Sequence, residues 1–142
     1  MNLKIKRLDP DLPLPSYATE GSVGLDLYCS FGCLVLPGSV TMIQTGIAVE
    51  IPPGYEGQVR GRSGLGKCGV GIPHGTGTID SDYRGEVMVM LVNHRDGPGH
   101  RIQRGDRIAQ LIIAPVARCS VVEVEELSDT ERGAGGFGST GR

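Results

Sequence analysis

The feature that most limits how this chain can fold is its regular alternation of short apolar segments with glycine and proline turns. Turn signals such as Pro37-Gly38, Pro52-Pro53-Gly54 and Asp96-Gly97-Pro98-Gly99 separate segments rich in Val, Ile, Leu and Thr. No stretch shows the long amphipathic period of a helix. About eight to ten short strands between turns are typical of a β-sandwich, jelly roll or barrel, so the sequence predicts one all-β domain.

The expected strands differ in how far they are buried. Alternating residues predict half-exposed strands, continuous apolar runs predict buried ones, and the expected segments are 3–8, 24–30, 32–36, 40–51, 55–60, 87–92, 108–116 and 122–124. The run at 87–92 is apolar at every position and should be buried on both faces. The segment at 122–124 alternates Val with Glu and should form a last, half-exposed strand.

Glycine marks two irregular regions. Residues 61–77 include seven glycines and are expected to be mostly loop. From residue 128 onward five of fifteen residues are glycine and almost none are apolar. We therefore expect a β domain over 1–127, followed by a flexible C-terminal strap over 128–142.

Composition excludes several kinds of partner. The net charge is −2, and the chain has two Phe, four Tyr and no Trp, whereas binding single-stranded nucleic acid calls for basic surface and stacking rings. No apolar run approaches the roughly 18–20 residues that span a bilayer, and the first ten residues lack a signal-peptide core. These features predict a cytoplasmic protein with no nucleic-acid or membrane partner. The four cysteines form no CxxC pair, which favours reduced thiols over a zinc or disulfide framework.

The strap contains residues suited to a ligand. Arg132 supplies a guanidinium that can grip phosphate, and the glycines offer backbone N–H groups that can approach an anion closely. A disordered tail is the ordinary interpretation of such a segment. Phe137 argues against it, because a ring has no packing role in a disordered tail, whereas a ring that closes over a planar base would explain it.

A second candidate site lies just before the apolar run at 87–92. Asp80, Asp82, Arg84 and Glu86 fall within seven residues. A solvated turn is the ordinary interpretation of such a cluster. Because Asp80 follows the apolar Ile79 where a strand enters the core, we hypothesise that it is partly desolvated and acts as a general base.

Five segments, in order, resemble the five motifs of the trimeric dUTP pyrophosphatases (dUTPases). They are GSVGLDL at 21–27, RSGL at 62–65, GTIDSDYRG at 77–85, GDRIAQLI at 105–112 and RGAGGFGSTG at 132–141. Each motif alone is only moderately specific. All five at the family's spacing, on a chain of the family's length, identify the sequence as similar to this family over most of its length.

The resemblance implies a distorted jelly-roll fold and a homotrimer with active sites shared between subunits, each strap closing over a neighbour's site. It implies hydrolysis of dUTP to dUMP and pyrophosphate, with Mg²⁺ bound to the phosphates. That reaction limits uracil incorporation into DNA and supplies dUMP for thymidylate synthesis.

The same resemblance implies roles for single residues. Asp80 would deprotonate the water that attacks the α-phosphorus, Gln110 would help hold that water or a phosphate oxygen, and Asp26 would meet Mg²⁺ only through water. The residues expected to bind phosphate are Arg62, Ser63 and Gly64, with Arg132, Gly138, Ser139 and Thr140 closing over the γ-phosphate. The residues expected around the nucleoside are Gly77, Thr78 and Ile79 at the uracil edge, Tyr83 and Met88 at the deoxyribose, and Phe137 on the face of uracil.

The sequence departs from the family's common pattern at a few positions. Val23 stands in place of Ala, and Gly61 and Gly66 stand in place of Pro and Ala on either side of RSGL. None of these changes removes a functional group. His74 lies where many members have Asn, and it either contacts the substrate in a comparable way or is a surface residue.

Two alternative functions remain at this stage. The dCTP deaminases share the fold and some motifs, but they need groups aimed at the cytosine amino group. A non-enzymatic nucleotide-binding β module is the other alternative, and its signature would be the loss of Asp80, Gln110 or Arg132. All three residues are present.

Overall fold

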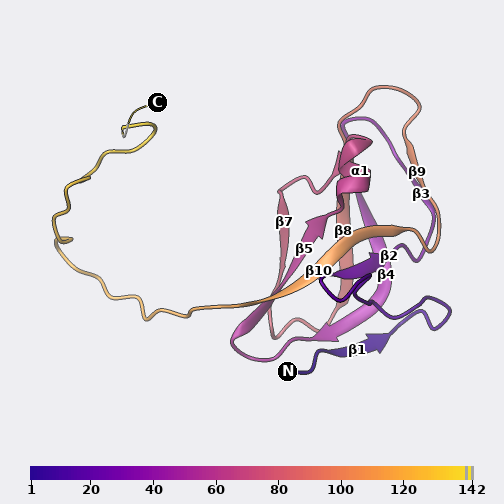
Figure 1. Cartoon of the computed structure of the whole chain (residues 1–142), viewed down its shortest axis with the longest axis horizontal. Coiled ribbons are helices and arrows are strands. Elements are labelled where there is room, and N and C mark those ends of the chain that lie inside the picture. Colours follow the sequence, from indigo (N-terminus) through magenta and orange to yellow (C-terminus); the bar gives the residue numbers. More distant parts are fainter. Residues whose placement is uncertain (140, 142) are drawn as a thin grey trace.

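Two four-stranded antiparallel sheets and a two-stranded ribbon make up the body of the protein (Figure 1). The computed structural model describes residues 1–139 and 141. The elements, in chain order, are β1 (Lys4–Arg7), β2 (Leu25–Tyr28), β3 (Cys33–Val35), β4 (Val40–Glu50), β5 (Tyr55–Gly61), α1 (Ser63–Lys67), β6 (Val70–Gly71), β7 (Thr76–Ile79), β8 (Glu86–Asn93), β9 (His100–Ile102) and β10 (Arg107–Pro115). The sheets have the strand orders β1-β4-β8-β6 and β2-β10-β5-β7, and β3 pairs with β9. The all-β class expected from the turn spacing is confirmed.

The core draws side chains from both large sheets. Val89 and Leu91 of β8 are fully buried, as are Leu27 of β2 and Ile108 of β10, and all belong to one apolar cluster. Burying this apolar surface between two layers is what holds a sandwich together. The sheet β2-β10-β5-β7 carries Asp26 on β2 and Gln110 on β10, and β5 leads directly into Arg62, Ser63 and Gly64, so this core fixes their relative positions.

The β8 strand is buried on both faces only at its end, where Leu91, Val92 and Asn93 are all buried, so the expectation of burial on both faces was wrong for the rest of the strand. From Glu86 to Leu91 its residues alternate between half-exposed and buried, with Met88 and Met90 on the outward side. Met90 pairs with Met42 of β4, and Val40 lies two residues along from Met42 on the same side. Val40 and Met42 are more than half exposed. An apolar outer face, formed by Val40, Met42, Met88 and Met90, is therefore open in the single chain.

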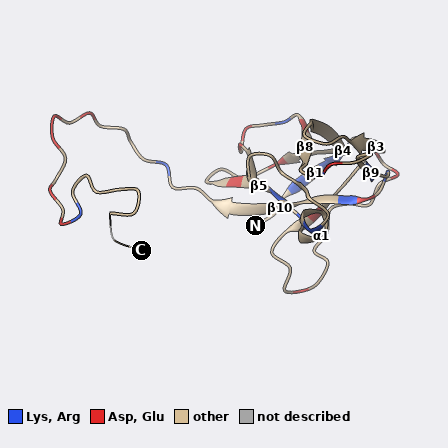
Figure 2. Ribbon diagram, turned by 90° about the horizontal axis from the view of Figure 1, so that it is seen from above, with Lys and Arg blue, Asp and Glu red and all other residues tan. Residues whose placement is uncertain are grey.

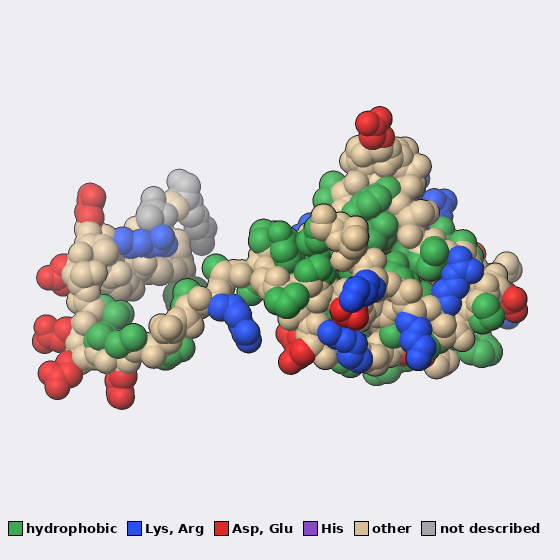
Figure 3. Space-filling model, turned by 90° about the horizontal axis from the view of Figure 1, so that it is seen from below, with side chains coloured by type: hydrophobic (Ala, Val, Ile, Leu, Met, Phe, Trp, Pro, Cys, Tyr) green, Lys and Arg blue, Asp and Glu red, His purple; other side chains and the backbone are tan. Residues whose placement is uncertain are grey.

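The tail after β10 forms no strand at 122–124, so that expectation was also wrong. The chain leaves the body after Pro115 and runs away from it (Figures 1 and 2), and its acidic side chains face outward (Figure 3). Val121 is 99% exposed and Val122 is 74% exposed. A strand needs a hydrogen-bonded neighbour, and this segment meets none within the described part of its own chain.

The glycine-rich stretch after β5 contains a short helix that the sequence did not predict. Its five residues, Ser63–Lys67, include two glycines, bury no side chain and have no side-chain N-cap. Without an apolar period or a cap, such a turn of helix leaves no signal in the sequence. No helix among the described residues has the length and apolar character needed to cross a membrane.

Candidate active site

The sheet β2-β10-β5-β7 brings three of the motif-like segments to one place. Gln110 of β10 pairs in register with Asp26 of β2 on one side and with Arg60 of β5 on the other. Arg62 follows β5 directly, where the chain turns into α1, and the expected phosphate-binding residues Ser63 and Gly64 begin that helix. Residues far apart in the sequence therefore share one end of this sheet.

A buried carboxylate with two arginines is the best-defined feature of this end of the sheet. Asp26 is only 2% exposed. Its Oδ1 lies 3.2 Å from Arg62 Nε, and its Oδ2 accepts a hydrogen bond of 3.2 Å from Arg107 Nη1. Arg62 Nη1 also donates to the backbone carbonyl of Arg107 at 3.2 Å. We call Asp26, Arg62 and Arg107 the Asp26 triad.

The residues of the triad fit a metal ion that is held mainly through water. Arg62 Nε is close to Asp26 Oδ1 but not aligned with it, so Oδ1 is buried without a hydrogen-bond partner among the described residues. Such an oxygen can accept a hydrogen bond from a metal-bound water. Within residues 1–139 and 141, no three His, Cys, Asp or Glu side chains are grouped to hold a metal directly. This donor set suits Mg²⁺, which keeps several waters and binds substrate phosphates.

Asp80 lies at the other end of the same sheet. It follows Ile79, the last residue of β7, and Ile79 pairs with Gly57 of β5. Arg62, the residue after β5, is five positions from Gly57. At the usual rise per residue of a strand, this corresponds to a distance of about 16 Å along the strand. Asp80 is exposed in the single chain, so the expectation that it is partly desolvated was wrong. The hydrophobic neighbour Ile79 points into the core and leaves Asp80 in water.

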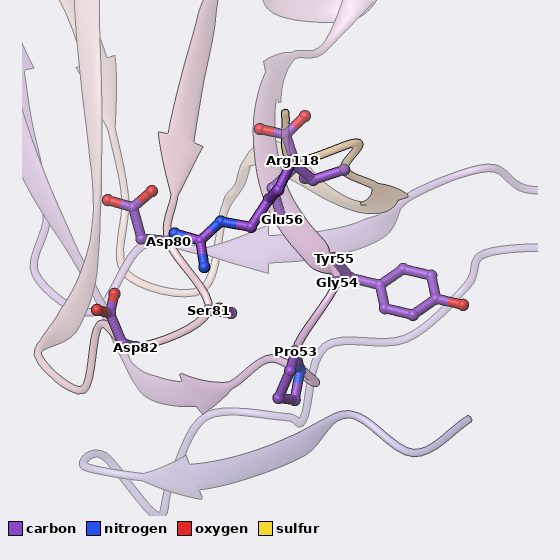
Figure 4. A pocket seen from close by; sticks show the side chains of 9 residues that line it. Pro53, Gly54, Tyr55, Glu56, Asp80, Ser81, Asp82 and Arg118 are labelled. Atoms are coloured by element: carbon purple, nitrogen blue, oxygen red, sulfur yellow. The ribbon is translucent and has the colours of Figure 1, made fainter. Parts of the chain in front are cut away.

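Asp80 borders a cavity of about 530 Å³, which is lined by Pro53, Gly54, Tyr55, Glu56, Asp80, Ser81, Asp82, Val116 and Arg118. The Arg118 guanidinium points from the start of the tail toward Asp80, while the Tyr55 ring points away (Figure 4). Three carboxylates share this cavity with one guanidinium. Neither Arg118 nor Glu56 was expected at the site. They come close to Asp80 only because the folded chain brings β5 and the start of the tail next to the end of β7, which the sequence does not show.

The segment around β7 forms a tight hairpin. His74 Nδ1 lies 2.8 Å from the carbonyl oxygen of Thr76, which closes the turn into β7. Gly77, Thr78 and Ile79 form the strand, and Ile79 alone of these three is buried. The imidazole of His74 is therefore part of the hairpin, and its contact with a substrate stays a prediction.

Tyr83 folds back over the turn that follows. Its hydroxyl donates to the carbonyl oxygen of Glu86 at 3.0 Å, and the residue is 44% exposed. A Cβ at Gly85 would lie 2.3 Å from the Tyr83 hydroxyl oxygen, so only glycine leaves room for this arrangement. Met88, also expected near the sugar, lies on the outer face of β8.

The strap holds its candidate residues away from the body. Arg132 Nε donates to the carbonyl oxygen of Gly135 at 3.0 Å, and Phe137 is fully exposed. Phe137 also has a positive φ of 47°, which is uncommon for a residue with a side chain. Gly138 and Ser139 follow it in the same exposed loop. Thr140, the last expected γ-phosphate contact, lies outside the described residues.

Arg107 is a further residue near the candidate site that the sequence did not indicate. It lies inside the motif-like segment 105–112, but only Gln110 received a role there. Its link to Asp26 depends on the register between β10 and β2, which shifts between Arg107 and Ala109. A register shift between two strands cannot be read from the amino-acid sequence.

Comparison with known proteins agrees with this arrangement. A family model described as dUTPase matches residues 11–141. The deoxyuridine 5'-triphosphate nucleotidohydrolase of Anaeromyxobacter sp. is 53% identical, covering 100% of this chain and 99% of its own length, and that of Nautilia profundicola is 51% identical, covering 100% of both. The dUTPase of Staphylococcus bacteriophage 80alpha, solved with dUPNHPP, has a TM-score of 0.88 at 30% identity, covering 99% of both chains. The chain belongs to the dUTPase family.

Proposed function

We propose that this chain hydrolyses dUTP to dUMP and pyrophosphate by attack of an Asp80-activated water on the α-phosphorus. The observation that most supports this function is the Asp26 triad beside Gln110. Two arginines held on one buried carboxylate make a cationic site for a polyphosphate, in a chain of the dUTPase family. The dCTP deaminase alternative has no such support, because the relatives named here are dUTP nucleotidohydrolases.

In the proposed step, the oxygen of a water molecule forms a bond to the α-phosphorus while its proton passes to the Asp80 carboxylate. The bond from the α-phosphorus to the oxygen that bridges to the β-phosphorus breaks, and pyrophosphate leaves with the electron pair. Gln110 orients the water or an α-phosphate oxygen. Arg62, Ser63 and Gly64 stabilise the charge that develops on the leaving group, with Ser63 at the bridging oxygen. Mg²⁺ bound to the phosphates would neutralise part of the same charge.

The nucleoside is proposed to lie in the β7 hairpin. Backbone groups of Gly77, Thr78 and Ile79 would pair with the uracil edge, and the tightness of the hairpin would exclude the amino group of cytosine and the methyl group of thymine. Tyr83 and Met88 would contact the deoxyribose and leave no space for a 2′-hydroxyl. Phe137 would then stack on uracil, while Arg132 and the residues after Phe137 close over the γ-phosphate.

We further propose that each site is completed between subunits of a homotrimer. Asp80 follows β7 beside Gly57, and Arg62 lies about 16 Å along the β5 direction from Gly57, so we propose that the two residues act on one triphosphate from different chains. The apolar outer face of Val40, Met42, Met88 and Met90 is a surface that a second copy would bury. The strap extends from the body (Figure 1), and in the proposed trimer it reaches a neighbouring subunit.

A turnover assay on dUTP, dCTP, dTTP and UTP, with Mg²⁺ and with EDTA, tests the proposed function. We expect pyrophosphate release from dUTP alone and a large loss of rate in EDTA. Release of ammonia from dCTP would support a deaminase instead. Binding of dUTP without turnover under any condition would support a nucleotide-binding module.

A further inference from the structure

We propose that Glu86 is a positioning residue for sugar selectivity, because it ties the Tyr83 ring to an irregularity in the neighbouring strand β4. The inference rests on the proposed function, in which Tyr83 lies against the deoxyribose, and it deepens that function. It assigns part of the discrimination between deoxyribose and ribose to a side chain that does not itself touch the substrate.

The first support is the irregular pairing of β4 with β8. The register shifts between Gln44 and Ala48, where three residues of β4 lie opposite the single residue Val87 of β8. Gly46, the middle one of the three, has a φ of 69°, and a Cβ there would lie 2.6 Å from the Cβ of Asp9. The bulge therefore requires glycine at this position. Bulges redirect side chains and are common beside active sites.

The second support is the way in which the carboxylate of Glu86 closes this bulge. Gly46 is buried, and its N–H lies outside the regular pairing of β4 with β8 and donates to Glu86 Oε1 at 2.8 Å. Gln44 Nε2 donates to the other carboxylate oxygen at 3.1 Å. A buried backbone N–H is costly without a partner, and a bond to a carboxylate is stronger than one to a neutral oxygen. The Glu86 side chain is therefore fixed to the bulge through both of its oxygens.

The third support is that the backbone of the same residue holds Tyr83. The Tyr83 hydroxyl donates to the Glu86 carbonyl oxygen at 3.0 Å, and this is the only hydrogen bond of the Tyr83 side chain among the described residues. Tyr83 is 44% exposed, and the adjacent Gly85 brings no side chain to pack against the ring. Because packing covers only part of the ring, its position depends on where the Glu86 carbonyl lies.

Glu86 therefore connects the bulge in β4 to the turn that carries Tyr83. It is the first residue of β8, where its side chain bonds to the bulge and its carbonyl bonds to the ring. Loss of the carboxylate would release the bulge and let the start of β8 move, and the Tyr83 ring would move with it. In the proposed site, a displaced ring leaves space beside the sugar for a 2′-hydroxyl. Turnover of UTP would then rise relative to turnover of dUTP.

The test compares kcat/KM for dUTP and for UTP, together with the melting temperature of each variant. Glu86→Met removes the carboxylate at similar side-chain length, whereas Glu86→Gln keeps an oxygen for the Gly46 N–H. Tyr83→Phe keeps the ring and removes its bond to Glu86. The matched control is Glu50→Met, because it removes a β4 carboxylate that bonds to Lys4 and is bonded to neither the bulge nor Tyr83.

The measured quantity is the ratio of kcat/KM for dUTP to kcat/KM for UTP. We expect this ratio to fall about tenfold in Glu86→Met and about tenfold in Tyr83→Phe. Because both changes break one connection, the double variant should lose no more than about twofold beyond either single variant. Glu86→Gln should keep the ratio within about threefold of the wild type, and Glu50→Met should leave it unchanged.

Several results would overturn the proposal. An unchanged ratio in Glu86→Met, with equal losses for dUTP and UTP, would show that Glu86 only supports the pairing of β4 with β8. Losses that multiply in the double variant would show that Glu86 and Tyr83 act independently. If Glu86→Met does not fold, Glu86→Asp, whose carboxylate is one methylene shorter, takes its place with the same expectations. A wild-type protein that turns over dUTP and UTP equally would instead contradict the proposed function, and the role of Glu86 with it.

Discussion

At the residue scale, Asp80 is exposed to water just after the end of β7. Its proposed role as a general base therefore depends on its position beside the attacking water and not on burial of its carboxylate. We predict that Asp80→Asn binds dUPNHPP almost as well as the wild type but turns over dUTP slower by about two orders of magnitude or more, because it cannot accept the proton of the attacking water. Asp82→Asn, which removes an exposed carboxylate from the same turn, is the matched control. Nearly unchanged turnover in Asp80→Asn would mean that another group activates the water.

The cysteines give a residue-scale prediction that does not depend on function. Burial raises the pKa of the Cys29 thiol to about 11, with a further contribution from nearby Cys33, whose own pKa is also raised by burial. Cys119 is exposed on the tail. The thiolate is the reactive form, so alkylation at pH 8 followed by mass spectrometry should modify Cys119 rapidly and Cys29 very slowly.

The raised pKa of Cys29 also fixes the direction of a pH effect on stability. The folded protein holds the neutral thiol more strongly than the unfolded chain does, so this contribution is complete below pH 9 and is lost as the pH rises toward 11. Cys29→Ser should therefore flatten part of the alkaline decline in the free energy of unfolding. Identical alkaline profiles for the two proteins would contradict the assigned shift.

Individual candidate site residues could be assigned from the sequence only where a motif carried them. The segments at 77–85 and 105–112 contain Asp80, Tyr83 and Gln110 within recognisable patterns. The bonds of Asp26 to two arginines were not predictable, because they join β2 to residues 36 and 81 positions away through the sheet register. The exposure of Asp80 was missed for a similar reason: an apolar neighbour in sequence need not cover the next side chain.

At the scale of elements, the sequence predicted strands well where turn residues bracket them. The long strand β4 ends just before Pro52-Pro53-Gly54, and β5 starts directly after it, as expected. The failures have physical causes. The helix α1 is too short and too rich in glycine to show a period, and the segment at 122–124 lacks a partner strand within its own chain.

The strap supports a prediction at this scale. Its described side chains from Arg132 onward bond only within the strap, and Phe137 is fully exposed. Deleting residues 132–142 should therefore abolish dUTP turnover while changing the melting temperature by no more than about 2 °C, because little apolar burial is lost. Differential scanning calorimetry measures the melting temperature, and a turnover assay measures dUTP hydrolysis. A truncated protein that melts far below the intact one would show that the strap is part of the folded core.

At the scale of the whole molecule, the proposed function divides each active site between two chains. One half is the Asp26 triad with Gln110, and the other is Asp80 with the β7 hairpin, at the opposite end of β5. The open apolar outer face and the extended strap (Figure 3 shows the strap) are the features that the proposed homotrimer would use. A homotrimer accounts for all of these features together.

Complementation between two inactive variants tests this account most directly. Asp80→Asn and Arg62→Gln, each inactive alone, are co-expressed with different affinity tags, and trimers that carry both tags are isolated. If each site takes Asp80 from one subunit and Arg62 from the next, one site in each mixed trimer has both wild-type residues, so we predict about one third of wild-type dUTP turnover. Mixed trimers no more active than their parents would place both residues in the site of a single chain and contradict the account.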